Sequence, residues 1–327
     1  MIDPKVAGGS TVAASVLAVP DDALAVAARS PIELFWRRLR ADRVALAALA
    51  FIALLVLVAI LAPLVVKLFG APPPNEPSRD ALDPTFGSPT GPSSAHLFGV
   101  DELGQDVFSR VVYGARVSLE VAIVATGTAV AAGVLVGMLA AYYGGWIDTI
   151  ISRALDVLLA FPILLLGIGL ASACALGNGC LGIIQPGLTV VVVIIALATF
   201  PYIARIIRGQ VLSLREKEFI DAARSLGASD RRIIFRHILP NLVAPIIVYT
   251  TLMLPQNILF EAALSFLGVG VRPPQASWGQ MIADATPVFD TAWWWMFFPG
   301  VALVLTVLAF NLVGDGLQDA LDPKTRA

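Results

Sequence analysis

Long apolar runs constrain this chain more than any other feature. A helix rises about 1.5 Å per residue, so about 20 apolar residues are needed to cross roughly 30 Å of hydrocarbon. Five runs meet this length, and a sixth does so when prolines are accepted inside a helix. The predicted spans are Val44 to Val66, Ser118 to Tyr142, Ala154 to Ala175, Leu188 to Ile207, Ile238 to Phe260 and Ala292 to Val313. The sequence therefore predicts an all-α membrane protein with six transmembrane helices.

Composition agrees with a chain whose surface largely faces lipid. Hydrophobic residues make up 57% of the sequence and charged residues 14%, and the mean hydropathy is +0.82. A net charge of −2 gives no reason to expect a nucleic-acid partner. The histidines His96 and His237 and the cysteines Cys174 and Cys180 lack the spacing of a zinc site, so no metal site is predicted.

Positive charge distinguishes the two sides of the membrane. The loop from Phe69 to Val117 carries more acidic than basic residues, and Arg272 is the only base in the loop before the last span. Basic residues gather instead before the first span and between the fourth and fifth, at Arg37, Arg38, Arg40, Arg43, Arg205, Arg208, Arg215, Lys217, Arg224, Arg231, Arg232 and Arg236. The positive-inside rule therefore predicts that both termini are cytoplasmic.

The spans divide the chain into five expected parts. Pro31 to Arg43 either forms a short amphipathic helix in the membrane interface or continues the first transmembrane helix. The Pro-, Gly- and Ser-rich external loop is expected to be extended coil. The expected parts are a flexible cytoplasmic tail (1–30), the N-terminal amphipathic segment with the first span (31–68), the external loop (69–117), a core of five spans (118–315) containing a charged loop (208–237), and a cytoplasmic C-terminal tail (316–327).

A charged block, EFIDAARSLGASDRRIIFRHILPN, interrupts the apolar sequence from Glu218 to Asn241. Small and apolar residues recur in it at helical spacing, at Phe219, Ala222, Ala223 and Leu226. Gly227 ends that helix, and Ser229 or Asp230 is placed to cap a second one. This pattern predicts two short helices that meet at a glycine at the cytoplasmic surface. They either dock a partner protein or form a basic loop that only sets topology.

The same block resembles the loop of the integral-membrane subunits of ATP-binding-cassette importers. That family has Glu-Ala-Ala, a Gly four residues beyond the second Ala, and a closing Ile-x-Leu-Pro. This chain has Asp221, Ala222 and Ala223, then Gly227, and ends in His237, Leu239 and Pro240. Asp replaces Glu and His replaces Ile; the His-Ile-Leu-Pro-Asn ending is familiar from the peptide-transporter branch.

Two further stretches are similar to the C-type permeases of dipeptide, oligopeptide and nickel importers. The first is HLFGVDELGQDVFSRVVYGARVSLEVA, in which Val100 and Gln105 replace the usual Thr and Arg; its family positions are Asp101, Gly104, Asp106, Ser109 and Arg110. The second is ALSFLGVGVRPPQASWGQMI, before the last span. The resemblance extends from about Phe35 to Asp322.

The resemblance implies a type I importer permease that pairs with a homologous second permease. Two cytoplasmic ATPases, or one fused ATPase, would bind below, and an extracytoplasmic binding protein would deliver dipeptides or oligopeptides. A bacterial or archaeal plasma (inner) membrane is implied. The loop implied to couple the ATPases to transport carries Glu218, Asp221, Ala222, Ala223, Ser225, Leu226, Gly227, Ala228 and Arg231.

Catalysis is not expected in this chain. It contains no G-x-x-x-x-G-K-[ST] loop, so the partner subunits would bind ATP and Mg and carry out hydrolysis. Nickel chelates or another small solute are the alternative cargo. An ion-coupled carrier is less favoured because few ionisable residues lie inside the spans. An intramembrane enzyme is not favoured either, because the sequence contains no motif typical of one.

Several smaller features carry their own expectations. Cys174 and Cys180 are either joined in a disulfide or free thiols at a helix end. Gly133 and Gly137 form a G-x-x-x-G pattern that predicts close helix packing. Arg153 and Asp156 are expected either to pair or to reach the cytoplasmic interface. The remaining expectations are pairing of Arg110 and Arg116 with Asp101 and Asp106, water contact for Glu120 and Glu261, and membrane-interface positions for Trp293, Trp294 and Trp295.

Overall fold

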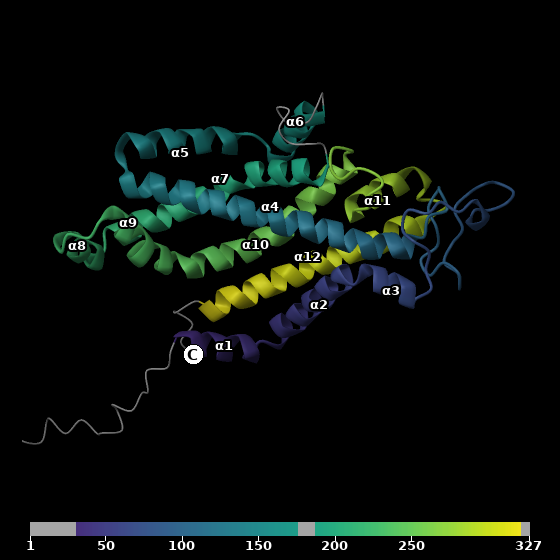
Figure 1. Cartoon of the computed structure of the whole chain (residues 1–327), viewed down its shortest axis with the longest axis horizontal. Helices are drawn as coiled ribbons and strands as arrows, with labels where there is room; N and C mark the ends of the chain where they lie inside the picture. Colours follow the sequence, from purple (N-terminus) through teal and green to yellow (C-terminus); the bar gives the residue numbers. More distant parts are fainter. Residues whose placement is uncertain (1–30, 176–186, 322–327) are drawn as a thin grey trace, which may run out of the picture.

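The computed structural model describes residues 31–175 and 187–321. Within these ranges the chain is mostly helical, and the long helices run along one axis of the molecule (Figure 1). Extended pairing is limited there to two isolated bridges, Leu82 with Pro89 and Val100 with Asp106. The tail expected at 1–30 and the last six residues lie outside the described part.

The N-terminal segment forms a separate helix, α1 (Pro31–Ala41), followed by α2 (Arg43–Ile60) and α3 (Ala62–Leu68). Asp42 lies between α1 and α2 in an extended conformation, and its carboxylate accepts hydrogen bonds from the backbone N–H groups of Val44 and Ala45. An N-cap of this kind begins a new helix. Of the two alternatives for this segment, continuation of the first transmembrane helix is therefore wrong.

Helix α4 (Val107–Tyr143) is longer than the sequence suggested, with 37 residues. It begins at Val107, eleven residues before the expected span, so residues 107–117 are helical and not extended coil. At 1.5 Å per residue its length is about 55 Å, roughly 25 Å more than the hydrocarbon core. A helix of this length extends beyond the hydrocarbon core, and its polar first turns are compatible with a position outside it.

The third predicted span is not one straight helix. Helix α5 (Gly145–Ala160) and helix α6 (Ile163–Ala175) are bent by 92° at Phe161 and Pro162. Phe161 has the extended backbone that a following proline favours, which ends α5. In the described residues, five helices are long and apolar enough to cross a membrane, and a sixth span requires counting this bent pair as one.

The remaining long helices are α7 (Leu188–Arg215), α10 (Leu239–Phe266) and α12 (Trp293–Leu321). Helix α12 continues to Leu321, so the first residues of the tail expected at 316–327 are helical. Helix α4 packs along α7, as the glycine pattern predicted: a Cβ built on Gly137 would lie 2.3 Å from the carbonyl oxygen of Ala204. Helix α12 packs against both α2 and α10.

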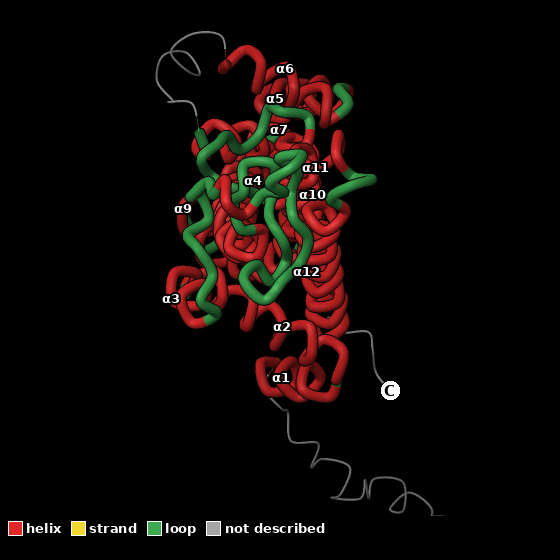
Figure 2. Tube along the Cα trace, turned by 90° about the vertical axis from the view of Figure 1, so that its right-hand side faces the viewer, coloured by secondary structure: helices red, strands yellow, loops and turns green. Residues whose placement is uncertain are grey.

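Short elements lie at the two ends of the long helices. Helices α8 (Glu218–Ser225) and α9 (Asp230–Ile233) lie at one end, followed by a π-helical turn, η3 (Ile234–Ile238). The loop before α4, with η2 (Arg79–Ala81), lies at the other end together with α11 (Trp278–Ala285) and η4 (Thr286–Val288). Figure 2 looks onto this second end, where loops cover the helix ends. Helix α1 and the end of α12 lie toward the α8 end (Figure 1).

Candidate functional site

The charged block folds as two short helices that meet at Gly227, as predicted. Gly227 has φ +75°, a left-handed conformation in which a side chain costs energy. Its N–H donates to Arg224 and the N–H of Ala228 donates to Ala223, which closes the end of α8. Ser229 occupies the N-cap position of α9 without a side-chain capping bond. No other group of the described chain would contact a Cβ at Gly227, so only the backbone conformation requires glycine there.

The apolar residues of α8 divide between two faces. Ile220 and Ala223 are buried in a cluster that includes Ile203 and Ile233, and they hold α8 against the rest of the chain. Phe219 and Leu226 point away from that cluster and are 42% and 88% exposed. The predicted single small, apolar face is therefore wrong in one respect: Ala223 lies on the inner side, and Ala222 is exposed beside Phe219.

Polar contacts attach this pair of helices to the membrane-spanning core. The hydroxyl of Tyr142, at the end of α4, donates to a carboxylate oxygen of Asp230 at 2.7 Å. At the same end, Arg215 of α7 donates to the carbonyl oxygen of Ala141 at 2.9 Å and joins α7, which leads into α8, to α4. Helix α10 follows directly after η3, with Pro240 in its first turn. The Tyr142–Asp230 hydrogen bond and η3 thus connect α9 to α4 and α10.

The other predicted residues of the block are mostly at its surface. Arg224 and Asp221 approach within 3.8 Å on α8, at the exposed positions i and i+3. His237 and Leu239 are partly buried, whereas Pro240 is exposed. Ala228 is partly exposed, and the following residues are exposed: Glu218, Asp221, Ala222, Ser225, Leu226, Gly227 and Arg231.

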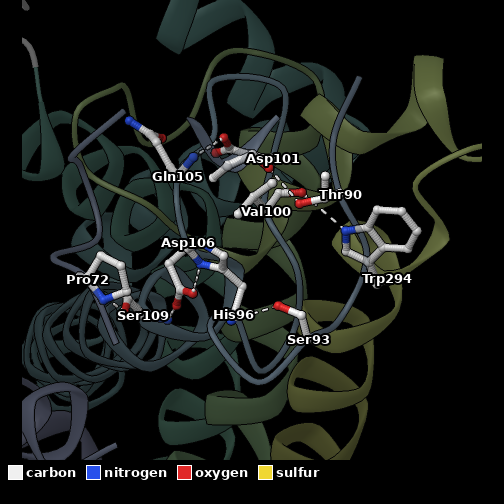
Figure 3. A network of polar contacts seen from close by, with 11 residues as sticks. Pro72, Thr90, Ser93, His96, Val100, Asp101, Gln105, Asp106, Ser109 and Trp294 are labelled. Atoms are coloured by element: carbon white, nitrogen blue, oxygen red, sulfur yellow. Dashed lines mark hydrogen bonds and ion pairs between the residues drawn. The ribbon is translucent and has the colours of Figure 1, made fainter. Parts of the chain in front are cut away.

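Three of the external family residues, Asp101, Asp106 and Ser109, make polar contacts at the other end of α4 (Figure 3). The carboxylate of Asp101 accepts hydrogen bonds from the N–H groups of Leu103 and Gln105, at 2.9 and 2.8 Å, and lies 3.5 Å from Nε of Arg110. Burial raises the pKa of this carboxyl, while those N–H groups and the guanidinium act in the opposite direction. The predicted pairing of Arg110 with Asp101 is confirmed.

Asp106 holds the start of α4 in this network. One of its oxygens accepts the N–H of Ser109 at 2.8 Å, as an N-cap, and the other lies 2.9 Å from Nδ1 of His96. The hydroxyl of Ser109 donates to the carbonyl oxygen of Pro72 at 2.6 Å. Asp106 thus pairs with His96 and not, as predicted, with Arg116, which is exposed.

Gly104 completes the loop that carries these side chains. Its φ is +73°, and a Cβ there would lie 1.9 Å from the carbonyl oxygen of Ser78. Both the conformation and the close approach exclude a side chain. We name the segment from Pro72 to Arg110 the external cap; its family residues are buried, so they build the cap and do not form its outer surface.

Two protein-family models match this chain. Residues 133–327 match the family described as the binding-protein-dependent transport system inner membrane component, and residues 30–84 match the N-terminal TM domain of oligopeptide transport permease C. The chain belongs to this family of transport permeases. Its members are permeases and not catalytic subunits, as the sequence resemblance implied.

Curated relatives of the permease are similar over nearly their whole length. A dipeptide transport system permease protein of Alkalihalophilus pseudofirmus is 42% identical over 91% of each chain. A glutathione transport system permease protein of Pectobacterium atrosepticum is 42% identical, over 91% of this chain and 93% of its own. The inward-facing MetNI methionine ABC transporter has a chain of the same fold, with a TM-score of 0.54 and 19% identity, over 65% of this chain and 96% of that one.

A buried carboxyl that the sequence misplaced lies near the external end of the permease. Glu261 is fully buried, so the expected water contact is wrong. It accepts hydrogen bonds from Ser265 at 2.7 Å and Ser118 at 3.0 Å, and Ser118 in turn accepts the N–H of Trp278. Glu261 therefore joins α10 to α4 and to the start of α11. Ser265, one helical turn after Glu261, is the only local sign in the sequence that this carboxyl has a hydrogen-bond partner. The other partner, Ser118, is too far away in the sequence to be recognised from a local pattern.

The tryptophans at the start of α12 and the charged pair on α5 also bear on the sequence predictions. Trp294 and Trp295 are 8% and 2% exposed, so only Trp293 is positioned for the membrane interface. Trp294 instead donates from Nε1 to the carbonyl oxygen of Val100 in the external cap, at 3.1 Å (Figure 3). Arg153 and Asp156 do approach, at 4.0 Å, and Asp156 also pairs with Arg205.

Two site predictions remain open. Cys174 is buried at the end of α6, but Cys180 lies outside the described residues, so the disulfide stays a prediction. In the described ranges, no three His, Cys, Asp or Glu side chains gather in a way that could hold a metal ion.

Proposed function

We propose that this permease forms, with a homologous second permease, the translocation path of an ATP-driven importer of short peptides. Curated relatives with about 42% identity are permeases of dipeptide and glutathione transport, and glutathione is itself a tripeptide. Two cytoplasmic ATPases, or one fused ATPase, would bind ATP and Mg. An extracytoplasmic binding protein would deliver the peptide. The membrane would be the inner membrane of a bacterium, because the relatives are bacterial.

The observation that carries the proposal is the exposed apolar surface of α8. Leu226 and Phe219 are exposed on a short charged helix that the positive-inside rule places outside the bilayer. Large apolar side chains in such a position indicate a protein partner. The proposed ATPase contacts are Glu218, Asp221, Ala222, Ser225, Leu226, Gly227, Ala228 and Arg231, with Ala223 supporting α8 from within.

The mechanism follows from how α8 is attached. When the ATPases close on ATP, they would displace α8 and α9 as one unit, because Ile220 and Ile233 belong to the same buried cluster. The hydrogen bond from Tyr142 to Asp230 and the continuity of η3 with α10 would pass this displacement to α4 and α10. The path would then open alternately to each side of the membrane.

The external cap offers a surface for the binding protein. Phe86 and Leu103 are 85% and 56% exposed on it, at the end of the molecule opposite α8. The buried pairs beneath them, Asp101 with Arg110 and Asp106 with His96, hold the cap in one conformation. A preformed surface loses little conformational entropy when it binds.

The proposed orientation predicts the labelling of two single cysteines in a background without Cys174 and Cys180. Ser88→Cys, in the external cap, should react with a membrane-impermeant maleimide in intact cells. Ser229→Cys, between α8 and α9, should react only after permeabilisation. The reverse pattern would place α8 outside the cell and exclude any contact with ATPases.

Peptide transport itself is tested with the complete complex in proteoliposomes. We expect uptake of a labelled dipeptide that requires ATP and the binding protein, and that is absent when either is omitted. Nickel chelate uptake is measured in parallel. Transport of the chelate without any di-, tri- or longer peptide would contradict the proposed substrate class and favour the alternative.

A further inference from the structure

A groove lies among α6, α7 and α10 in the membrane-spanning part of the permease. Its volume is about 680 Å³, enough for a small peptide. On α10 it extends from Tyr249 to Ala263, which corresponds to about 21 Å at 1.5 Å per residue. The groove therefore follows α10 through much of the thickness of the hydrocarbon core.

The groove lining combines apolar residues with a few neutral polar ones. The polar side chains among its described lining are Thr199, Tyr202, Tyr249, Gln256 and Asn257, and none of the lining residues is charged. Two of these are already used within the fold: Thr199 donates to the carbonyl of Ile195, and Asn257 donates to Thr126.

Gln256 differs from its neighbour Asn257 in its surroundings. Asn257 is 1% exposed and donates to the hydroxyl of Thr126 at 2.8 Å. Gln256 is exposed, and its amide makes no hydrogen bond to another described residue. It lies within the apolar sequence of α10, directly after Pro255, which breaks the regular hydrogen bonding of the helix.

An exposed amide at this depth indicates a polar neighbour other than lipid. Facing hydrocarbon, its unpaired donors and acceptor would be costly, whereas in a water-filled path they can bind water or substrate. Helices broken by proline at membrane depth are likewise tolerated where they line a cavity. Tyr202, 51% exposed and next to Pro201 in α7, has the same combination across the groove.

We propose that this groove is the permease's own part of the peptide path and that Gln256 contacts the passing peptide. The inference rests on the proposed function and specifies its substrate contacts. An amide both donates to and accepts from a peptide backbone, which every peptide has. The described lining from this chain carries no charge, so it does not favour one sign of peptide charge over the other. We therefore expect selection by charge to lie mainly with the binding protein.

The test places opposite charges at position 256. Gln256→Glu and Gln256→Lys are each compared with the wild type in the complete reconstituted complex, with the same binding protein. The substrates are alanyl-lysine, alanyl-glutamate and alanyl-glutamine. We expect Gln256→Glu to raise the ratio of alanyl-lysine to alanyl-glutamate uptake by about fivefold, and Gln256→Lys to lower it similarly, which corresponds to about 1 kcal/mol.

Gln318 provides the matched control. It is exposed near the end of α12 and does not line the groove, so Gln318→Glu and Gln318→Lys should leave the uptake ratio unchanged. A structural defect would lower the uptake of all three peptides together, whereas a path contact shifts the ratio in opposite directions for the two charges. If the wild type transports peptide and both Gln256 variants keep its ratio of alanyl-lysine to alanyl-glutamate uptake, this inference is overturned and the proposed function stands. A wild type that transports no peptide would overturn the proposed function as well.

A second measurement applies if the charged variants do not assemble. Gln256→Cys, in a background without the native cysteines, should react with negatively and positively charged methanethiosulfonates, and substrate during turnover should slow the reaction. Absence of reaction with both reagents would mean that position 256 faces lipid or is covered by the second permease, and would contradict the proposal.

Discussion

Replacing Gly137 with alanine is expected to prevent most of the permease from reaching a stable fold. The new Cβ would lie 2.3 Å from the carbonyl oxygen of Ala204 and 3.1 Å from the backbone nitrogen of Arg208. Both atoms belong to the backbone of α7, so no side-chain rotation can relieve the overlap. Helices α4 and α7 would have to separate along the largest helix contact in the described chain.

The expected loss follows from overpacking, which costs about 1–3 kcal/mol and more when backbone must move. The measurement is the yield and melting temperature of detergent-purified permease. Gly127→Ala is the control, because Gly127 is on the same helix, is exposed and has no group within 4 Å of a built Cβ. It should be neutral or stabilising by up to about 1 kcal/mol, since alanine favours helix over glycine. Equal stability of the two variants would contradict the close packing.

Gly227→Asp should leave folding nearly intact and abolish coupled transport. Its Cβ would meet no group within the described ranges 31–175 and 187–321, so the cost to the isolated permease is that of φ +75°, about 1 kcal/mol. At the proposed ATPase contact, the same change adds bulk and charge next to Leu226. Contacts at the centre of an interface cost about 2 kcal/mol or more when disrupted, roughly 30-fold in affinity. Gly227→Ala should have a milder effect.

Three measurements separate the outcomes for Gly227: subunit stoichiometry, substrate-stimulated ATP hydrolysis and peptide uptake. Gly70→Asp is the matched control, because Gly70 has φ +66° and open space around its Cβ but follows α3 at the other end of the first span. We expect it to assemble and transport normally. Wild-type uptake by Gly227→Asp would leave the charged block as a topology signal and nothing more.

Apolar length predicted the spans because burial in hydrocarbon depends on residue type alone, but it did not predict where helices continue or bend. The first turns of α4 contain Ser109 and Arg110, and their polarity predicts a loop, although Asp106 has the identity and position of an N-cap. Pro162 was accepted inside a span, as Pro201 and Pro255 correctly were. Only neighbouring helices decide whether a proline is accommodated or ends the helix.

In the candidate sites, too, contacts between residues near in sequence could be predicted and contacts between distant residues could not. Local sequence was sufficient for the two helices at Gly227 and for the pairing of Asp101 with Arg110, because their partners are near in the chain. It was not sufficient for Glu261, whose partner Ser118 comes from another helix 143 positions away. Which of Ala222 and Ala223 turns inward likewise depends on a tertiary cluster that no local pattern contains.

The unbroken length of α4 restricts how the two sides of the membrane can move. One helix leads from the external cap at Asp106 to the hydrogen bond of Tyr142 with Asp230, beside the proposed ATPase contact (Figure 1). A rod about 55 Å long that tilts by about 5° around its centre displaces its ends by roughly 2.4 Å in opposite directions. In the proposed transport cycle, such a tilt would narrow the path at one side of the membrane while it widens the path at the other. A stiff α4 would thus couple opening on one side to closure on the other without a separate gate on each side.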